Sequence, residues 1–107
     1  MTEEYIKEYF NQVDNLTAIC RVNSGWARGE HPELEIGSTY HVTHIGVLRS
    51  SSNIMLSEFP GRSYNASCFD IFENDMPIQH EYSQDPRFWA PYLRKLYRKR
   101  NPQWITE

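Results

Sequence analysis

Short stretches in which apolar and polar residues alternate recur along this chain and limit what it can fold into. In residues 16–22 every second side chain is apolar, and an Asn-Ser-Gly turn signal follows at 23–25. Successive side chains of a β-strand point to opposite faces of a sheet, so this alternation predicts strands with one buried face. The sequence predicts five such strands, at residues 16–22, 34–36, 40–47, 54–59 and 69–73.

The first fifteen residues show helical spacing instead. Thr2 can cap a helix whose first turn carries Glu3 and Glu4, near the positive end of the helix dipole. Apolar side chains then recur about one turn apart, at Tyr5, Ile6, Tyr9, Phe10 and Val13. We therefore expect an N-terminal helix over residues 1–15.

In the third predicted strand the alternating apolar residues change from even-numbered positions, Tyr40 and Val42, to odd-numbered positions, Ile45 and Val47. A strand keeps one parity unless an extra residue is inserted, so we expect a bulge, or burial on both faces, near Gly46. The positions that keep strand parity predict a core of Ala18, Cys20, Ile36, Tyr40, Val42, Ile54, Leu56, Phe69 and Ile71.

The order of these elements resembles that of a known small barrel. Residues 16–73 contain, in this order, a strand, a long loop, a Leu-x-Ile-Gly-x-x-Tyr-x-Val turn, a hairpin and a one-turn segment before a short closing strand. This order is similar to that of the five-stranded SH3-like barrel. The nearer likeness is to small bacterial or mobile-element proteins of this type. The Ala-Leu-Tyr-Asp-Tyr motif and paired tryptophans of the eukaryotic peptide-binding members are missing here, so the resemblance does not imply proline-rich peptide binding.

The chain has the length of one domain, and we expect residues 1–107 to form a single one. The expected class is mainly β (α+β): an SH3-like barrel at 16–73, preceded by the N-terminal helix. A linker and a C-terminal basic aromatic helix are expected at 74–107. That helix begins after Asp85-Pro86 or at Pro91, because a proline inside a helix costs a hydrogen bond.

Charge is segregated along the chain. Residues 1–86 hold thirteen acidic and five basic residues, a net charge of −8, whereas residues 87–107 hold six basic residues and one acidic residue, a net charge of +5. A basic tail on an acidic body indicates binding, either to an anionic partner or back onto the body itself. A solvated basic face that stabilises the end of its helix is the alternative.

The candidate binding residues combine this basic face with two tryptophans. Trp26 and Arg28 lie in a polar loop, where Trp26 is either a lid over the barrel or a contact residue. Trp89 can stack on a nucleobase or dock its helix on the body. The full predicted set is Trp26, Arg28, Trp89, Arg94, Lys95, Arg98, Lys99 and Arg100.

The sequence predicts no catalytic residue, no metal site and no cofactor. His41 and His44 are expected on opposite faces of one strand, where they cannot share an ion. Cys20 and Cys68 are expected as reduced, buried thiols of a cytoplasmic protein, because the acidic N-terminus lacks an export signal and no apolar stretch is long enough to span a membrane.

Three functions fit these features. The first is a non-enzymatic protein-interaction or regulatory module with a protein partner. The second is a nucleic-acid-binding accessory protein that uses the basic C-terminal helix. The third is a mobile-element-encoded inhibitor, whose acidic body occupies the nucleic-acid site of a host protein because carboxylates can stand where phosphates lie.

Overall fold

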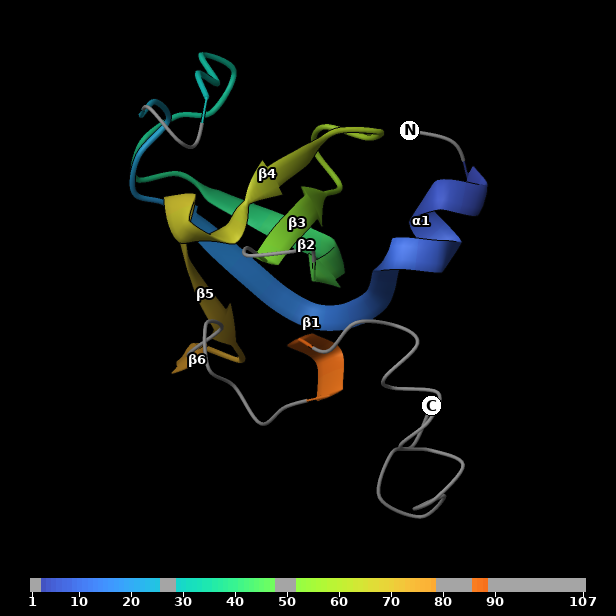
Figure 1. Ribbon diagram of the computed structural model, residues 1–107. Helices are drawn as coiled ribbons and strands as arrows, with labels where there is room; N and C mark the ends of the chain where they lie inside the picture. The colour runs from blue at the N-terminus through green and yellow to red at the C-terminus, as the bar shows by residue number, and fades with distance from the viewer. Residues whose placement is uncertain (1–2, 26–28, 48–51, 79–85, 89–107) are drawn as a thin grey trace.

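One antiparallel β-sheet forms the body of the protein. The computed structural model describes residues 3–25, 29–47, 52–78 and 86–88 (Figure 1). The chain begins with a helix, α1 (Glu3–Tyr9), and two short 3-10 turns follow later, η1 (Ala66–Cys68) and η2 (Pro86–Phe88). The strands are β1 (Phe10–Cys20), β2 (Thr39–Val47), β3 (Ser52–Leu56), β4 (Ser63–Asn65), β5 (Phe69–Glu73) and β6 (Met76–Ile78).

The sheet is open, with its six strands in the order β4-β3-β2-β1-β5-β6. The prediction of a mainly β fold with an N-terminal helix is confirmed, but the closed five-stranded barrel is wrong. The predicted strand at 34–36 is absent, and the sheet instead contains β4 and β6, two three-residue strands at its edges. Strands this short carry too little alternation to be recognised in a sequence.

The loop that replaces the predicted strand is held by hydrogen bonds from its own backbone. The N–H of Glu35 donates to the Tyr40 hydroxyl at 2.9 Å, and the N–H of Gly37 donates to the Cys20 carbonyl at 2.8 Å. Leu34 is buried here with 1% of its surface exposed, whereas Ile36 is 60% exposed. The assignment of Ile36 to the core is therefore wrong, because Leu34 fills that place.

The N-terminal helix is shorter than expected. It ends at Tyr9, and Phe10 and Val13 are buried side chains of β1. Phe10 lies opposite Gly46 of β2, and its ring covers the space where a side chain of Gly46 would be. The predicted helix over 10–15 is wrong because these apolar positions gain more burial against β2 than a free helix offers.

The remaining core prediction is confirmed. All the predicted core positions apart from Ile36 are buried, and both cysteines are free, buried thiols. Burial, together with the neighbouring Cys68, raises the pKa of the Cys20 thiol. In the ranges that the structure describes, no helix is long and apolar enough to cross a membrane.

Two bulges lie side by side in the middle of the sheet. In β1 the register against β2 shifts between Gln12 and Leu16, and in β2 the register against β3 shifts between Val42 and His44. The bulge expected from the parity change is thus present, at Thr43 rather than near Gly46. At each bulge the inward-facing side chains change from one set of alternate positions to the other. In β2 both Val42 and Ile45 are therefore buried, although three positions separate them.

Candidate functional site

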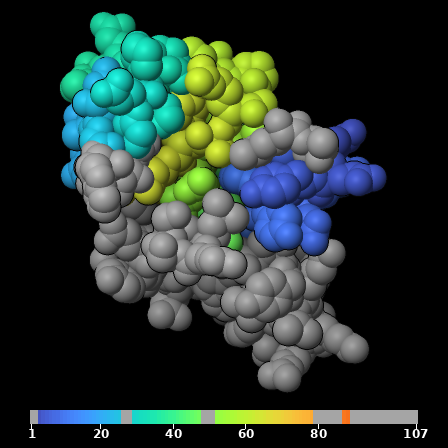
Figure 2. Space-filling model, turned by 45° about the horizontal axis from the view of Figure 1, so that its top comes forward, coloured from blue at the N-terminus to red at the C-terminus, as the bar shows by residue number. Residues whose placement is uncertain are grey.

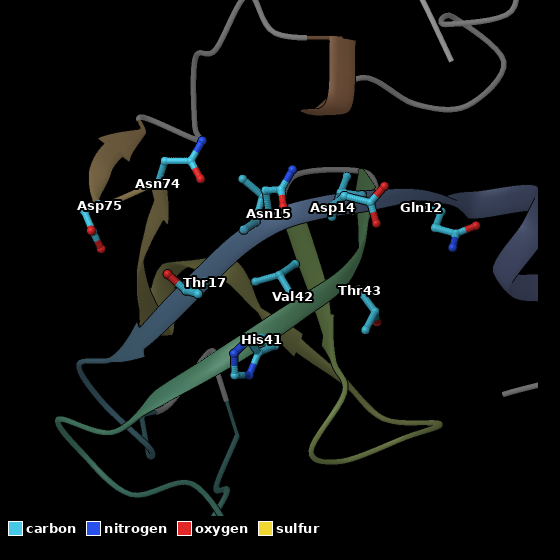
Figure 3. A pocket seen from close by; sticks show the side chains of 11 residues that line it. Gln12, Asp14, Asn15, Thr17, His41, Val42, Thr43, Asn74 and Asp75 are labelled. Carbon is cyan, nitrogen blue, oxygen red and sulfur yellow. The ribbon is translucent and has the colours of Figure 1, made fainter.

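A polar groove of about 540 Å³ opens where the two bulges meet (Figure 3). Its volume is within the range of small-molecule pockets, about 300–1,000 Å³. Val13, Leu16 and Val42 supply the apolar part of its lining. The rest is polar: Gln12, Asp14, Asn15, Thr17, His41, Thr43, Asn74 and Asp75.

The groove exists because β1 separates from β2 at the bulge. Three residues, 13–15, stand opposite Thr43 alone, so the ladder of hydrogen bonds is interrupted there. Asn15 has a φ of 62°, a left-handed conformation that asparagine tolerates better than most residues. The turn exposes the side chains of Asp14 and Asn15 at the rim of the groove.

The hairpin between β5 and β6 supplies the other rim. Asn74 and Asp75 form its two-residue turn, with φ values of 50° and 67°, which is the left-handed pair that tight hairpins require. Leu16 of β1 pairs with Glu73 of β5, so the turn that follows Glu73 comes next to the bulge of β1. Figure 3 shows Asn74 beside Asn15 and on the same side as Asp14.

The charges of the described residues are unevenly paired. Each described lysine or arginine has a carboxylate partner: Lys7 with Glu3, Arg21 with Asp70, Arg62 with Glu33, and Arg87 with Glu73. Within the same ranges, six carboxylates have no ion pair: Glu4, Glu8, Asp14, Glu30, Glu35 and Asp75. Two of these six, Asp14 and Asp75, stand at the groove, which therefore attracts cations.

An oriented histidine borders the groove. Glu58 accepts hydrogen bonds from the backbone N–H of His41 at 2.9 Å and approaches the His41 Nδ1 to 2.7 Å. Partial burial would raise the pKa of the Glu58 carboxyl, but the bonds with the His41 side chain and backbone outweigh it and hold the pKa below its usual value. His41 and Thr17 are register partners, and both side chains line the groove.

The loop that carries Trp26 and Arg28 is closed at its base. The N–H of Gly29 donates to the Gly25 carbonyl at 3.0 Å, and the N–H of His31 donates to the Asn23 carbonyl at 2.7 Å. Trp26 and Arg28 themselves lie outside the described residues. The closed base fixes the two points from which the chain enters and leaves that tip.

The same loop is fastened to β4 through Glu33. Its carboxylate accepts a hydrogen bond from the Tyr64 hydroxyl at 2.9 Å and pairs with Arg62 at 3.0 Å. The His31 ring lies edge-on to Tyr64, with 4.9 Å between the ring centroids. Burial and the bond to Glu33 raise the pKa of Tyr64 far above its usual value, so this phenol stays a donor.

The C-terminal segment starts from a fixed point on the body. Phe88 is buried in the core, and the Arg87 guanidinium forms two hydrogen bonds with the Glu73 carboxylate, at 2.5 and 3.1 Å. Asn11 donates from Nδ2 to the Arg87 carbonyl at 3.3 Å. Trp89, Arg94, Lys95, Arg98, Lys99 and Arg100, like the predicted C-terminal helix, lie outside the described residues.

The chemistry of the groove is that of a polar binding site. Among the described residues, no three histidine, cysteine, aspartate or glutamate side chains come together as a metal site. Carboxylates, amides and hydroxyls accept hydrogen bonds from an ammonium or a guanidinium group. The arrangement therefore suits a positively charged side chain.

Sequence reasoning missed the groove. Asp14 and Asn15 are residue types typical of a helix end, and Asn74 and Asp75 are typical of a linker. Neither pair therefore indicated a site. The change in the alternation of apolar residues around Thr43 was the one feature of the sequence that indicated the bulge there. No protein-family model matches the chain, and no curated protein or solved structure matches it either.

Proposed function

We propose that this protein is a non-enzymatic protein-interaction module whose groove receives a basic side chain of a protein partner. The observation that carries the proposal is the charge balance of the described body, in which each cation is paired and Asp14 and Asp75 at the groove are not. A guanidinium or ammonium group beside either carboxylate gains charge-assisted hydrogen bonds.

The partner that fits this surface is a protein with an exposed Arg or Lys. Asp14 and Asp75 are both exposed, and a single exposed ion pair is worth about 0.2–1 kcal/mol. Affinity therefore depends on further contacts, for which the amides of Gln12, Asn15 and Asn74 are placed around the same groove. The loop with Trp26 and Arg28 remains a second predicted contact, and backbone hydrogen bonds close its base.

An inhibitor of a nucleic-acid-binding protein is one form of the same proposal. The nucleic-acid site of such a protein is basic, and the exposed carboxylates of this body complement a basic surface. Direct binding of nucleic acid through the basic C-terminal residues is the competing proposal. The acidic body opposes it, because it repels a polyanion.

We also retain the SH3-like arrangement as a proposal, without barrel closure. The order of elements supports it: β1 leads through a long loop to the β2–β3 hairpin, and the η1 turn precedes β5, which pairs with β1. The strand β6 is an addition to that arrangement.

A binding experiment with short peptides tests the groove. A fluorescein-labelled peptide with two arginines among serine and glycine should bind the full chain, and a matched peptide with citrulline in place of arginine should not. Replacing both groove carboxylates, Asp14→Asn with Asp75→Asn, should weaken binding about 2- to 30-fold, the product of two exposed ion pairs.

The matched control is Glu30→Gln with Glu35→Gln, which removes the same charge at exposed positions away from the groove. It should change the affinity much less. Equal losses in the two variants would show general attraction to an acidic surface and would remove the groove from the proposal.

A further inference from the structure

The helix α1 presents an aromatic and acidic surface at one end of the molecule. None of its seven residues is buried, and it stands out from the body beside the start of β1 (Figure 1, Figure 2). Tyr5 and Tyr9 expose 38% and 39% of their surfaces, with their ring centroids 4.8 Å apart. Glu4 and Glu8 on the same helix have no ion pair within the described residues.

A helix of this length is not stable alone. Isolated helices shorter than about 12–15 residues are marginal in water, and the stability of a helix in a protein comes from packing of one face. The Tyr5 ring also lies 6.3 Å from the buried Phe10 ring, which ties the exposed aromatic pair to the body. A ligand on this face would bury the two tyrosine rings and lie against Glu4 and Glu8.

The basic end of the chain starts next to this helix. Asn11, two residues after the end of α1, holds the Arg87 carbonyl at 3.3 Å, and the buried Phe88 fixes the point from which residues 89–107 continue. Five residues lie between Phe88 and Arg94, and the six steps from one to the other reach about 20 Å in an extended chain. A seven-residue helix is about 10 Å long, so a segment that continues from beside Asn11 can extend along α1.

We propose that the C-terminal segment folds back and docks on α1. The cations of residues 94–100 would pair with Glu4 and Glu8 and lie over the rings of Tyr5 and Tyr9, where a guanidinium gains a cation–π contact. This contact is separate from the groove and goes beyond its proposed function. It makes the basic residues a clamp on the chain's own surface, and leaves fewer of them for an external polyanion.

Charge reversal in the full-length chain tests the contact. In a ¹⁵N-labelled variant with Arg94, Lys95, Arg98 and Lys99 all changed to Glu, the amide signals of residues 3–9 should shift, and their hydrogen exchange should become faster. The amide signals of β1 to β5 should stay, which shows that the body is folded.

The matched rescue distinguishes α1 from the groove. Adding Glu4→Lys with Glu8→Lys to the reversed tail should return exchange protection to residues 3–9. Adding Asp14→Lys with Asp75→Lys instead, an equal change of charge, should not. Equal rescue by both pairs, or α1 signals that ignore tail reversal, would overturn the proposal.

A salt titration of the unmodified chain gives the answer if the reversed variant unfolds. Raising the salt from about 0.01 M to about 1 M shortens the Debye length from about 30 Å to about 3 Å. The signals of residues 3–9 should then shift and lose exchange protection, and α1 signals that do not respond to salt would contradict docking. The peptide experiment on Asp14 and Asp75 is unaffected by either result.

Discussion

At the residue scale, Glu33 shows how one side chain joins distant parts of the chain. It lies in the long loop between β1 and β2, and its partners Tyr64 and Arg62 lie in β4 and just before it. Partial burial alone would raise the pKa of this carboxyl, but hydrogen bonds from the backbone and Tyr64, and the charge of Arg62, outweigh it. The pKa of Glu33 is therefore below its usual value of 4.5.

This lowered pKa predicts acid sensitivity. A carboxyl whose pKa is lower in the folded than in the unfolded protein stabilises the fold above the unfolded pKa, and this contribution is lost as the pH falls through the folded pKa. We expect the free energy of unfolding, measured by urea denaturation, to fall below about pH 4.5, and Glu33→Gln to reduce this slope. Glu35→Gln, at an exposed position of the same loop, is the control; an identical slope in all three proteins would contradict the role of Glu33.

Core packing makes a second residue-scale prediction. Leu56 exposes 1% of its surface, so Leu56→Ala should lower the free energy of unfolding by about 2–5 kcal/mol. Ile36→Ala, at a position that is 60% exposed, should change it by less than about 0.5 kcal/mol. Urea denaturation of both variants is the measurement, and comparable losses would place Ile36 in the core after all.

At the element scale, the junction of α1 with β1 depends on a glycine of the neighbouring strand. A Cβ on Gly46 would stand 2.6 Å from the Phe10 ring, and Phe10 is buried. The ring cannot move aside as the end of a flexible side chain would. The close fit of Phe10 on Gly46 thus fixes where the helix ends and the sheet begins.

We expect Gly46→Ala to destabilise the protein by about 1–3 kcal/mol, the usual cost of overpacking. In a Phe10→Leu background the same change should cost less, because the smaller side chain leaves room. A double-mutant cycle by urea denaturation gives the coupling between the two positions. Equal costs in both backgrounds would show that the ring is not what restricts Gly46.

At the scale of the whole molecule, charge separates the body from the tail. The chain has a net charge of −3, composed of −8 over residues 1–86 and +5 over residues 87–107. Phe88 is buried in the core, so residues 89–107 continue from a fixed point on the acidic body. At physiological salt the Debye length is about 8 Å, and charges held within that distance still act on one another.

We therefore expect weak or undetectable binding to generic DNA or RNA at physiological salt. Fluorescence anisotropy with a labelled single strand is the measurement, and any binding should weaken with salt by a slope of about −0.7 per phosphate contact. Submicromolar affinity that disappears when Arg94, Lys95, Arg98 and Lys99 are all changed to Ala would instead favour the nucleic-acid function.

The sequence by itself determined the local features. Alternation at Ala18 and Cys20 and at Ile54 and Leu56 indicated strands and their buried faces, because the two-residue period of a strand is a local property. The 3-10 turn before β5 also followed from nearby residues, since Asn65 caps it by accepting the N–H of Ser67.

The tertiary structure decided the features that depend on contacts between neighbouring strands of the sheet. The spacing of Phe10 and Val13 suits a helix, and only the place offered by Gly46 and β2 makes this segment a strand. The groove likewise combines residues 12–17 with residues 41–43 and the 74–75 turn. Which segments lie side by side depends on strand register, and register is set by long-range pairing rather than by the pattern within one segment.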